Sequence, residues 1–321
     1  MHDIISIGDC TLDNLLQIHD AEVNCSLHSD RCMICVNFAD KIPIDKLHRK
    51  VAGNAANNAV GSSRLGLKTA FYTILGNDGT GEFIWERLEK EKVEMEYAIL
   101  DKRKETNSSF VINYKGERTI FVYHAPRIYS LPKLKPTEWI YYTSLGPNHQ
   151  KLNQQIVNFV KKNKTKLGYN PGTFQLRGGF KQMEEILKIT QVIFINKEEA
   201  ATIVGAQHDI RHYLLAVHKT GPKIVVITDG TNGSFCFDGE KFWQMDILNT
   251  PVIERTGAGD SYATAFIAAL HYKKSIAEAM CWGTCNSSSV IMKYGPQDGL
   301  LTKVQMIAFH KKYKHICPVN F

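Results

Sequence analysis

Short segments with strand character alternate with helical patterns over the second half of the chain, and this alternation limits the possible folds most. The runs at 139–142, 166–169, 192–195 and 223–228 predict strands, and helical patterns separate them. Parallel strands need long crossover connections, usually helices, whereas antiparallel strands can be joined by short turns. The sequence therefore predicts an α/β fold with a central, mostly parallel sheet flanked by helices on both faces.

The first half of the chain adds irregular β segments to this pattern. Residues 4–8 predict a first buried strand and residues 68–75 a further strand, and residues 53–65 between them predict a helix rich in small side chains. Segments 10–45 and 106–123 instead suit small antiparallel pieces. We expect a single domain over residues 1–321 with a small β appendage.

The composition is that of an ordinary globular protein. Of 321 residues, 44% are hydrophobic and 22% are charged, which argues against a long disordered or collagen-like chain. No run of about 18 uncharged apolar residues occurs, so we expect no membrane-spanning helix. Residues 1–30 contain six acidic residues and no Lys or Arg, unlike a secretory or transit signal. We therefore expect a cytoplasmic protein with reduced thiols.

Two local features each leave two interpretations open. Cys32 and Cys35 form a C-x-x-C that belongs either to a strand, which we favour, or to half of a zinc site. The net charge of +7 gathers in residues 139–183, which hold seven basic residues and no acidic one. Such a segment either attracts a polyphosphate or nucleic acid or is the solvated face of a helix. Because no stacking aromatics are interleaved with the basic residues, we favour the helix face and expect no nucleic-acid partner.

Thr256-Gly257-Ala258-Gly259-Asp260 carries the strongest chemical signal. Residues 251–253 before it predict the end of a strand, and an apolar helix follows. Glycines let a backbone approach a ligand, and the free N–H groups of a helix start attract anions. Gly257, Ala258 and Gly259 are thus candidates for an anion hole around a phosphoryl group, and Asp260 for the base that accepts a hydroxyl proton. The alternative is a glycine-rich turn followed by an ordinary first-turn acid.

Two segments of the first half could contact a small polar ligand. Asp13 follows the first predicted strand, at the sheet edge where ligands bind in such folds, and its carboxylate suits sugar hydroxyls. Gly53-Asn54-Ala55-Ala56-Asn57 lets a helix start pack closely against a ligand or a sheet, and Asn57 and Asn58 offer amides. The structural alternatives are an Asx turn and an Asn-capped helix.

Two segments of the second half follow predicted strands. Asn196 and Glu199 have the spacing of a capping box, which we favour, but an amide and a carboxylate also suit a water-bridged Mg²⁺. Thr228, Gly230 and Gly233 stand in a turn that lies under a nucleotide or simply forms a hairpin. No P-loop and no dinucleotide-binding glycine motif occurs.

In order and spacing, these five segments resemble the ribokinase-like (PfkB-type) carbohydrate kinase family, from Ile5 to about Leu301. The resemblance implies ATP- and Mg²⁺-dependent phosphorylation of a hydroxyl, expected to be a hydroxymethyl group, on a small sugar or sugar-like acceptor. Asp260 would be the base, beside an anion hole of Gly257, Ala258 and Gly259. The other implied contacts are Asp13, Gly53 and Asn57 to the acceptor, Thr228, Gly230 and Gly233 to the nucleotide, and Asn196 and Glu199 to Mg²⁺ and its waters.

The resemblance also implies that segments 10–45 and 106–123 form a lid over the acceptor, and that this lid can mediate a homodimer. The chain departs from the family pattern at Ala52, where a second glycine is usual, and at Glu254-Arg255, where Asp-Thr is frequent. The second departure leaves the need for a monovalent cation open, and Arg255 could instead bring its charge to the nucleotide phosphates. A further departure lies at 168–169, before Asn170.

Two alternative functions remain. A nucleoside kinase shares the fold and would need an aromatic shelf for the base, with Phe38, Phe110 and Tyr123 as candidates. A non-catalytic ligand sensor built on the same fold is the alternative of another class. The intact Asp260 and the glycines before it argue against the sensor.

Overall fold

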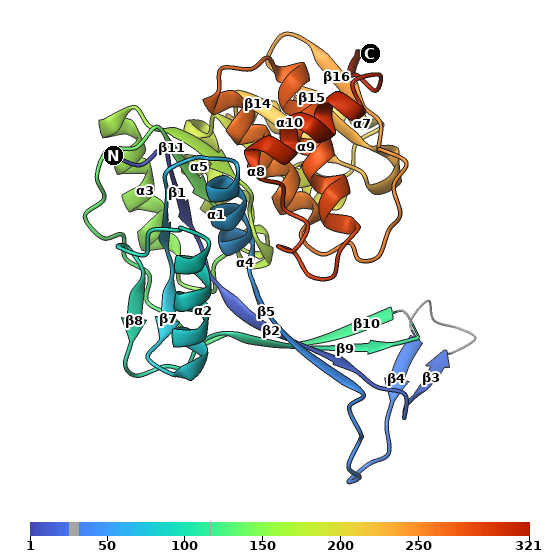
Figure 1. Cartoon of the computed structure of the whole chain (residues 1–321). Coiled ribbons are helices and arrows are strands. Elements are labelled where there is room, and N and C mark those ends of the chain that lie inside the picture. The colour runs from blue at the N-terminus through green and yellow to red at the C-terminus, as the bar shows by residue number, and fades with distance from the viewer. Residues whose placement is uncertain (26–31, 116) are drawn as a thin grey trace.

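A computed structural model describes residues 1–25, 32–115 and 117–321, and Figure 1 shows the course of the chain. Within these residues a nine-stranded sheet has the order β17-β16-β15-β14-β13-β12-β11-β1-β6. Its strands are β1 (Ile4–Ile7), β6 (Thr69–Tyr72), β11 (Trp139–Tyr142), β12 (Lys166–Tyr169), β13 (Val192–Asn196), β14 (Ile224–Thr228), β15 (Ser234–Phe237), β16 (Phe242–Met245) and β17 (Val319–Asn320). Neighbours from β6 to β14 pair in parallel, and β15 to β17 add antiparallel strands at one edge.

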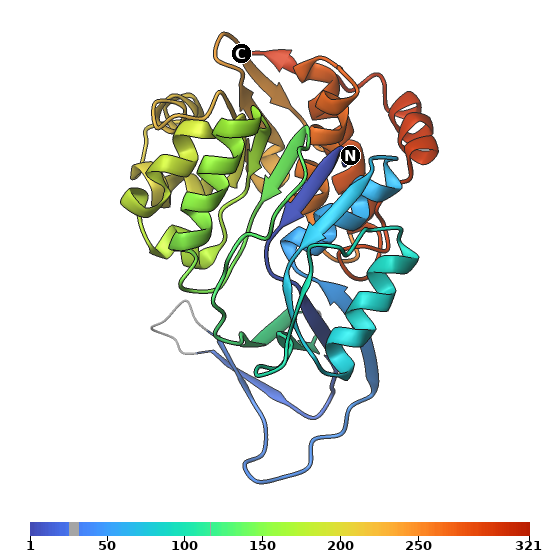
Figure 2. The same cartoon turned by 90° about the vertical axis from the view of Figure 1, so that its left-hand side faces the viewer.

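Helices cover both faces of this sheet, as Figures 1 and 2 show, and this confirms the predicted fold class. They are α1 (Asn54–Arg64), α2 (Gly79–Lys90), α3 (Gln150–Asn163), α4 (Thr173–Arg177), α5 (Phe180–Ile189), α6 (Lys197–Val204), α7 (Ile210–His218), α8 (Ala258–His271), α9 (Ile276–Ile291) and α10 (Lys303–Lys312). Successive side chains of a strand point to opposite faces of the sheet, so alternate residues belong to two separate hydrophobic cores. Trp139 and Tyr141 of β11 pack with residues of α8 and α9, whereas Ile140 and Tyr142 pack with residues of α3, α5 and α7.

A separate four-stranded sheet, here called the small sheet, projects from this body (Figure 1). Its order is β10 (Glu117–Tyr123), β9 (Ser108–Tyr114), β2 (Thr11–Gln17) and β5 (Lys46–Ala52). A hairpin of β3 (Glu22–Cys25) and β4 (Cys32–Cys35) lies in the same part of the chain, and β7 (Ile74–Gly76) pairs with β8 (Ile99–Asp101) beside α2. Strand β5 extends the small sheet beyond the segments expected from the sequence.

The C-x-x-C of the hairpin does not form a zinc half-site. In β3–β4 the residue opposite Cys25 is Cys32, with their Cα atoms 4.2 Å apart, and the two sulfurs are bonded as a disulfide. Cys32 therefore has no thiolate to offer a metal. The expectation of reduced thiols is wrong for this pair. The register of the antiparallel hairpin brings the two cysteines together, and their spacing in the sequence does not reveal that they pair.

Two predicted strands also differ from the structure. The apolar run at 251–253 is a loop, and Val252 and Ile253 are each about half exposed. Val252 lines a large cavity instead of a sheet. The run expected to form one strand at 68–75 divides at Thr73, so that β6 joins the main sheet and β7 pairs with β8.

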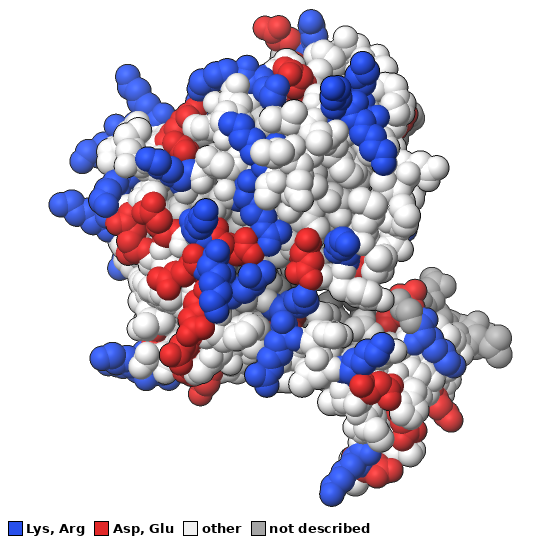
Figure 3. Space-filling view, in the orientation of Figure 1, with Lys and Arg blue, Asp and Glu red and all other residues white. Residues whose placement is uncertain are grey.

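The basic segment 139–183 is dispersed over the body. Lys161 and Lys162 occupy the last turn of α3, where the helix dipole favours cations, and Lys166 pairs with Glu138 at 3.0 Å. In Figure 3 basic side chains project singly on the side where α3 lies, without forming a continuous stripe. This arrangement favours the solvated helix face. Among the described residues, no helix is both long and apolar enough to cross a membrane.

Candidate active site

Asp260 lies in the first turn of α8, directly behind the glycine-rich segment. Gly257 precedes the helix with φ +79°, and no side chain caps the helix start. The Ala258 N–H donates to the Arg255 carbonyl at 3.3 Å, whereas the N–H groups of Gly259 and Asp260 that follow it remain available to a ligand. The Asp260 side chain is 9% exposed, and its Oδ2 accepts a hydrogen bond of 2.8 Å from Nδ2 of Asn57. Burial raises the pKa of Asp260 to about 6, although the Asn57 hydrogen bond opposes this shift. The carboxyl group can therefore exchange a proton near neutral pH.

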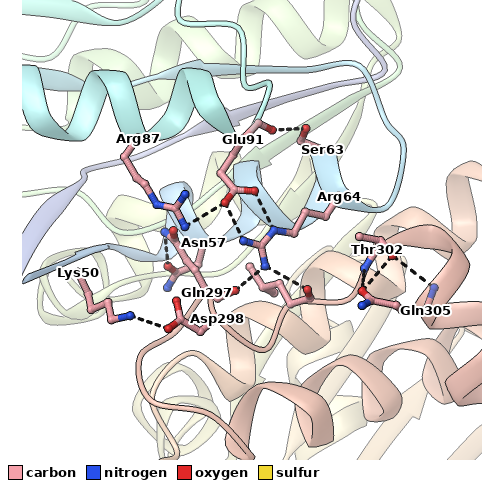
Figure 4. Close-up of polar contacts among 11 residues, drawn as sticks. Lys50, Asn57, Ser63, Arg64, Arg87, Glu91, Gln297, Asp298, Thr302 and Gln305 are labelled. Carbon is pink, nitrogen blue, oxygen red and sulfur yellow. Dashed lines mark hydrogen bonds and ion pairs between the residues drawn. The ribbon is translucent and has the colours of Figure 1, made fainter.

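Asn57 is held in turn by a loop from the far end of the chain (Figure 4). Gln297 donates from Nε2 to Oδ1 of Asn57 at 3.1 Å, and the Gln297 carbonyl accepts from Nη1 of Arg64 at 2.8 Å. Glu91 receives two hydrogen bonds from the Arg64 guanidinium. Sequence reasoning missed Gln297, because only the folded chain brings it beside Asn57, 240 positions away.

A polar cavity of about 230 Å³, here called the Asp260 cavity, opens beside this carboxylate. Six of its lining residues are Asn54, Asn196, Glu199, Thr228, Gly259 and Asp260. It therefore combines the helix starts of α1 and α8 with the ends of β13 and β14. Asn170, at the end of β12, also lines it and accepts a hydrogen bond from Asn54. The carboxyl ends of parallel strands thus converge on the cavity, as expected in α/β folds.

A larger cavity of about 330 Å³, here called the apolar cavity, adjoins the first. Both cavities are lined by Thr228, Gly259 and Tyr262. The apolar cavity brings the predicted nucleotide residues Thr228, Gly230 and Gly233 together, and Arg255 lines it as well. A Cβ added at Gly259 would meet no atom within 4 Å. The backbone at Gly259 therefore borders open space that connects the two cavities.

Asn196 and Glu199 form a capping box at the start of α6, as their spacing favoured. The Asn196 side chain accepts from the Glu199 N–H, and the Glu199 carboxylate accepts from the Asn196 N–H, both at 2.8 Å. Burial, together with the charge of Asp260, raises the pKa of Glu199. The cap uses only one Glu199 oxygen, and Glu199 and Asp260 line the same cavity. This donor set fits a divalent cation bound through water.

The three residues predicted to contact the acceptor lie in three different places in the structure. Asn57 lies against Asp260, and its amide is already bonded on both sides. Asp13 lies in β2, opposite Lys50 of β5, and lines a separate space between the small sheet and residues 254–256. Gly53 has φ +103°, and a Cβ there would lie 2.7 Å from the Asp9 carbonyl oxygen. Gly53 therefore permits close packing of two backbone segments.

Asn58 does not offer its amide to a ligand, contrary to the expectation from the sequence. Its Oδ1 accepts from Ser6, its Nδ2 donates to Thr264, and the residue is fully buried. On α1 it thus joins the first strand to α8, whereas its neighbour Asn57 turns toward Asp260.

Comparison with known families accounts for this combination of fold and site. The sequence model of the pfkB family carbohydrate kinases matches residues 15–303. The chain belongs to the pfkB family of carbohydrate kinases. The match covers most of the small sheet and the helix that carries Asp260.

Individual pfkB relatives and solved structures agree with this assignment. A ribokinase of Staphylococcus aureus is 24% identical over 257 residues, which are 76% of this chain and 83% of that protein. The fold is similar to Arabidopsis thaliana ribokinase complexed with ribose and ATP, at a TM-score of 0.80, 20% identity and coverage of 97% and 99%. It is equally similar to a nucleoside kinase of Methanocaldococcus jannaschii, at a TM-score of 0.79, 20% identity and the same coverage.

Proposed function

We propose that this carbohydrate kinase transfers the γ-phosphoryl group of ATP to a hydroxyl, expected to be a hydroxymethyl group, of a small sugar or sugar-like acceptor. The observation that carries the proposal is the position of Asp260. Its buried carboxylate lies at the start of α8, beside Gly259, which borders both the Asp260 cavity and the apolar cavity. A base, an anion-binding helix start and two adjoining cavities are the parts that phosphoryl transfer between two ligands needs.

In the proposed reaction the acceptor hydroxyl approaches Asp260 from the Asp260 cavity. Oδ2 is held by Asn57, so the carboxylate is oriented, and it takes the hydroxyl proton as the oxygen attacks the phosphoryl group. The N–H groups of Gly257, Ala258 and Gly259 stabilise the charge on the transferring group. The apolar cavity holds the nucleotide along Thr228, Gly230 and Gly233, with the Arg255 guanidinium near its phosphates.

Mg²⁺ belongs to the same proposal. Glu199, and Asn196 through water, would hold it in the Asp260 cavity, where it neutralises charge on the phosphates. The charge of Asp260 makes ionisation of Glu199 less favourable, and a bound cation would offset this effect. The Glu254 carboxylate accepts hydrogen bonds from Thr256 Oγ1 and from the Gly295 N–H.

We further propose that the small sheet is the lid over the acceptor, and that Asp13 and Gly53 lie on the acceptor's side. The face of the small sheet that carries Asp13, Val111 and Ile120 turns toward residues 254–256 of the body. Closure of this face would exclude water and limit the transfer of phosphoryl groups to water. The domain proposed for residues 1–321 thus includes a discontinuous lid.

The opposite face of the small sheet supports a homodimer. Phe110 and Phe121 are directly opposed in β9 and β10, adjacent to Val111 and Ile120 and hence on the other face. They are 46% and 57% exposed, and Tyr123 on the same face is 44% exposed. We propose that a second copy covers these aromatics. A cytoplasmic location, where ATP is available, is part of the proposal.

The same observation weighs against the nucleoside alternative. Phe110 and Tyr123, two candidates for a base shelf, lie on the opposite face of the small sheet from Val111 and Ile120, which line the space beside Asp13 and residues 254–256. The third candidate, Phe38, is fully exposed. A sugar acceptor needs no such shelf, so we place sugars before nucleosides.

An acceptor screen tests the proposed function. ADP release is measured over pentoses, hexoses, hexose phosphates, sugar acids and nucleosides, with thermal shift as a parallel measurement of binding. Acceptor-dependent ADP release with at least one sugar is expected. Turnover with nucleosides alone would favour the nucleoside kinase, and sugar binding with no turnover of any compound would favour the ligand sensor.

A further inference from the structure

A cavity lined by cations lies outside the two cavities of the active site. This basic cavity, about 100 Å³ in volume, opens between the edge strand β5, helix α2 and residues 296–298. Its side chains include Arg49, Lys50, Phe83, Arg87, Gln297 and Asp298. It shares no lining residue with the Asp260 cavity or the apolar cavity.

The cations of the basic cavity are only partly neutralised. Lys50 pairs with Asp298, the one carboxylate of the lining (Figure 4). Arg87 pairs with Glu91 at 3.0 Å, but Arg64 already binds both oxygens of that carboxylate. Arg49 is exposed and forms no ion pair with any residue that the structure describes. Three cations thus surround a small cavity in which a single carboxylate faces them.

Size and chemistry together specify a ligand class. At about 100 Å³ the basic cavity has room for a phosphate-sized group. Guanidinium groups bind phosphate oxygens through paired hydrogen bonds, and Lys supplies a further point charge. A dianion would replace Asp298 as the partner of Lys50 and would neutralise Arg49.

Gln297, in the wall of the basic cavity, also belongs to a series of hydrogen-bonded amides that leads to the proposed base. Gln297, 4% exposed, lines the cavity and donates to Asn57, which donates to Asp260. Asp298, the residue that an anion would displace from Lys50, is the next residue along the backbone. A change in the pairing of Asp298 therefore acts directly on the segment that positions Asn57.

We propose that the basic cavity binds a small phosphate-type dianion and that its occupancy modulates the active site through Gln297 and Asn57. The binding site stands on its own geometry, whereas the effect on turnover rests on the proposed kinase function. In either case the ligand is a phosphate group carried by a metabolite or free in solution.

Titration calorimetry with inorganic phosphate tests the binding, with sodium chloride at matched ionic strength in the cell and syringe. The proteins are the wild type, Arg49→Gln, the double variant Arg49→Gln/Arg87→Gln, and Lys90→Gln as a control that removes a cation from α2 outside the cavity. We expect saturable binding to the wild type and to Lys90→Gln. Arg49→Gln should weaken it by about tenfold or more, as expected for a lost charged hydrogen bond, and the double variant should abolish it.

Phosphate could also enter the helix start at Gly257, and the variants distinguish this outcome. Binding of equal strength in the wild type and the double variant would place the anion there and overturn the proposed site. If the double variant does not fold, Arg49→Gln decides alone, because Arg49 supports no ion pair among the described residues.

The coupling is tested by the kinetics of ADP formation with an acceptor from the screen. Phosphate should change kcat or KM in the wild type and in Lys90→Gln, and this response should be lost in Arg49→Gln. An identical response in all three proteins would overturn the coupling. If no acceptor is turned over, the proposed function fails, whereas calorimetry still decides whether the basic cavity is a site.

Discussion

The two glycine-rich helix starts, at α1 and at α8, have similar sequences but different physical roles. Gly53 and Gly257 both precede their helices with positive φ, and no side chain caps either start. At α1 the glycine is needed because the Asp9 carbonyl oxygen lies where a Cβ would be. At α8 the first glycine, Gly257, is packed in the same way, because a Cβ there would lie 2.6 Å from Pro296, but the second glycine, Gly259, borders open space at both cavities. Both motifs therefore use a glycine for packing, but the α8 motif adds Gly259, which leaves room for a ligand, although sequence inspection treats the two motifs alike.

The largest effect should come from α8. Asp260→Asn keeps the shape of the side chain but removes the proton acceptor, and we expect kcat to fall at least about 10²-fold. Steady-state ADP release with the acceptor from the screen measures it, and Asp20→Asn, at an exposed position, is the control. Near wild-type turnover of Asp260→Asn would remove the base from the mechanism.

Alanine at the two glycines separates packing from function. Gly53→Ala should destabilise the fold by about 1–3 kcal/mol, because its φ of +103° is strained for alanine and the new Cβ would meet the Asp9 backbone. Gly259→Ala should leave stability unchanged or raise it by up to about 1 kcal/mol, since alanine favours a helix. Its methyl group nevertheless enters the space between the cavities, so kcat/KM for ATP should fall about tenfold.

Urea denaturation and ATP kinetics on the same two variants measure this contrast. The comparison would break if Gly259→Ala unfolded more readily than Gly53→Ala, or if it retained full activity. In the first case Gly259 would serve packing, and in the second the open space at α8 would have no part in nucleotide binding.

The fold was accessible to sequence analysis because strand and helix periods alternate clearly from residue 139 onward. The roles of Gly53 and Gly259 were not, because a glycine has no side chain whose pattern reveals what lies beside it. Gln297 and the Cys25–Cys32 disulfide were missed for a related reason. Both depend on contacts that form only when the register and the loop positions are known.

The pH dependence of both turnover and stability should follow from the burial of Asp260 in α8. With the pKa of Asp260 at about 6, the carboxylate needed as a base is about one tenth populated at pH 5, so kcat should fall about tenfold there. The same raised pKa means that the folded state holds this proton more tightly than the unfolded chain. The contribution of Asp260 to stability is therefore lost as pH rises from about 4 to 6, by up to about 3 kcal/mol.

Denaturation of wild type and Asp260→Asn over pH 4 to 7 isolates that contribution, since the amide does not titrate. The difference between the two curves should widen in favour of the amide as pH rises. A constant difference would show that Asp260 has an ordinary pKa, and the acid limb of the rate profile would then need another group.

The smallest effect should come from α1, through Asn57. Its Nδ2 donates to the Asp260 carboxylate and so favours the ionised form. Asn57→Ala removes this hydrogen bond, worth about 0.5–1.5 kcal/mol, and should move the acid limb of the kcat profile upward by about half to one pH unit. Asn58→Ala, whose amide bonds Ser6 and Thr264 instead, should lower stability without moving that limb. An acid limb that stays in place in Asn57→Ala would mean that α1 orients no part of the base, and the two helix starts would then act independently.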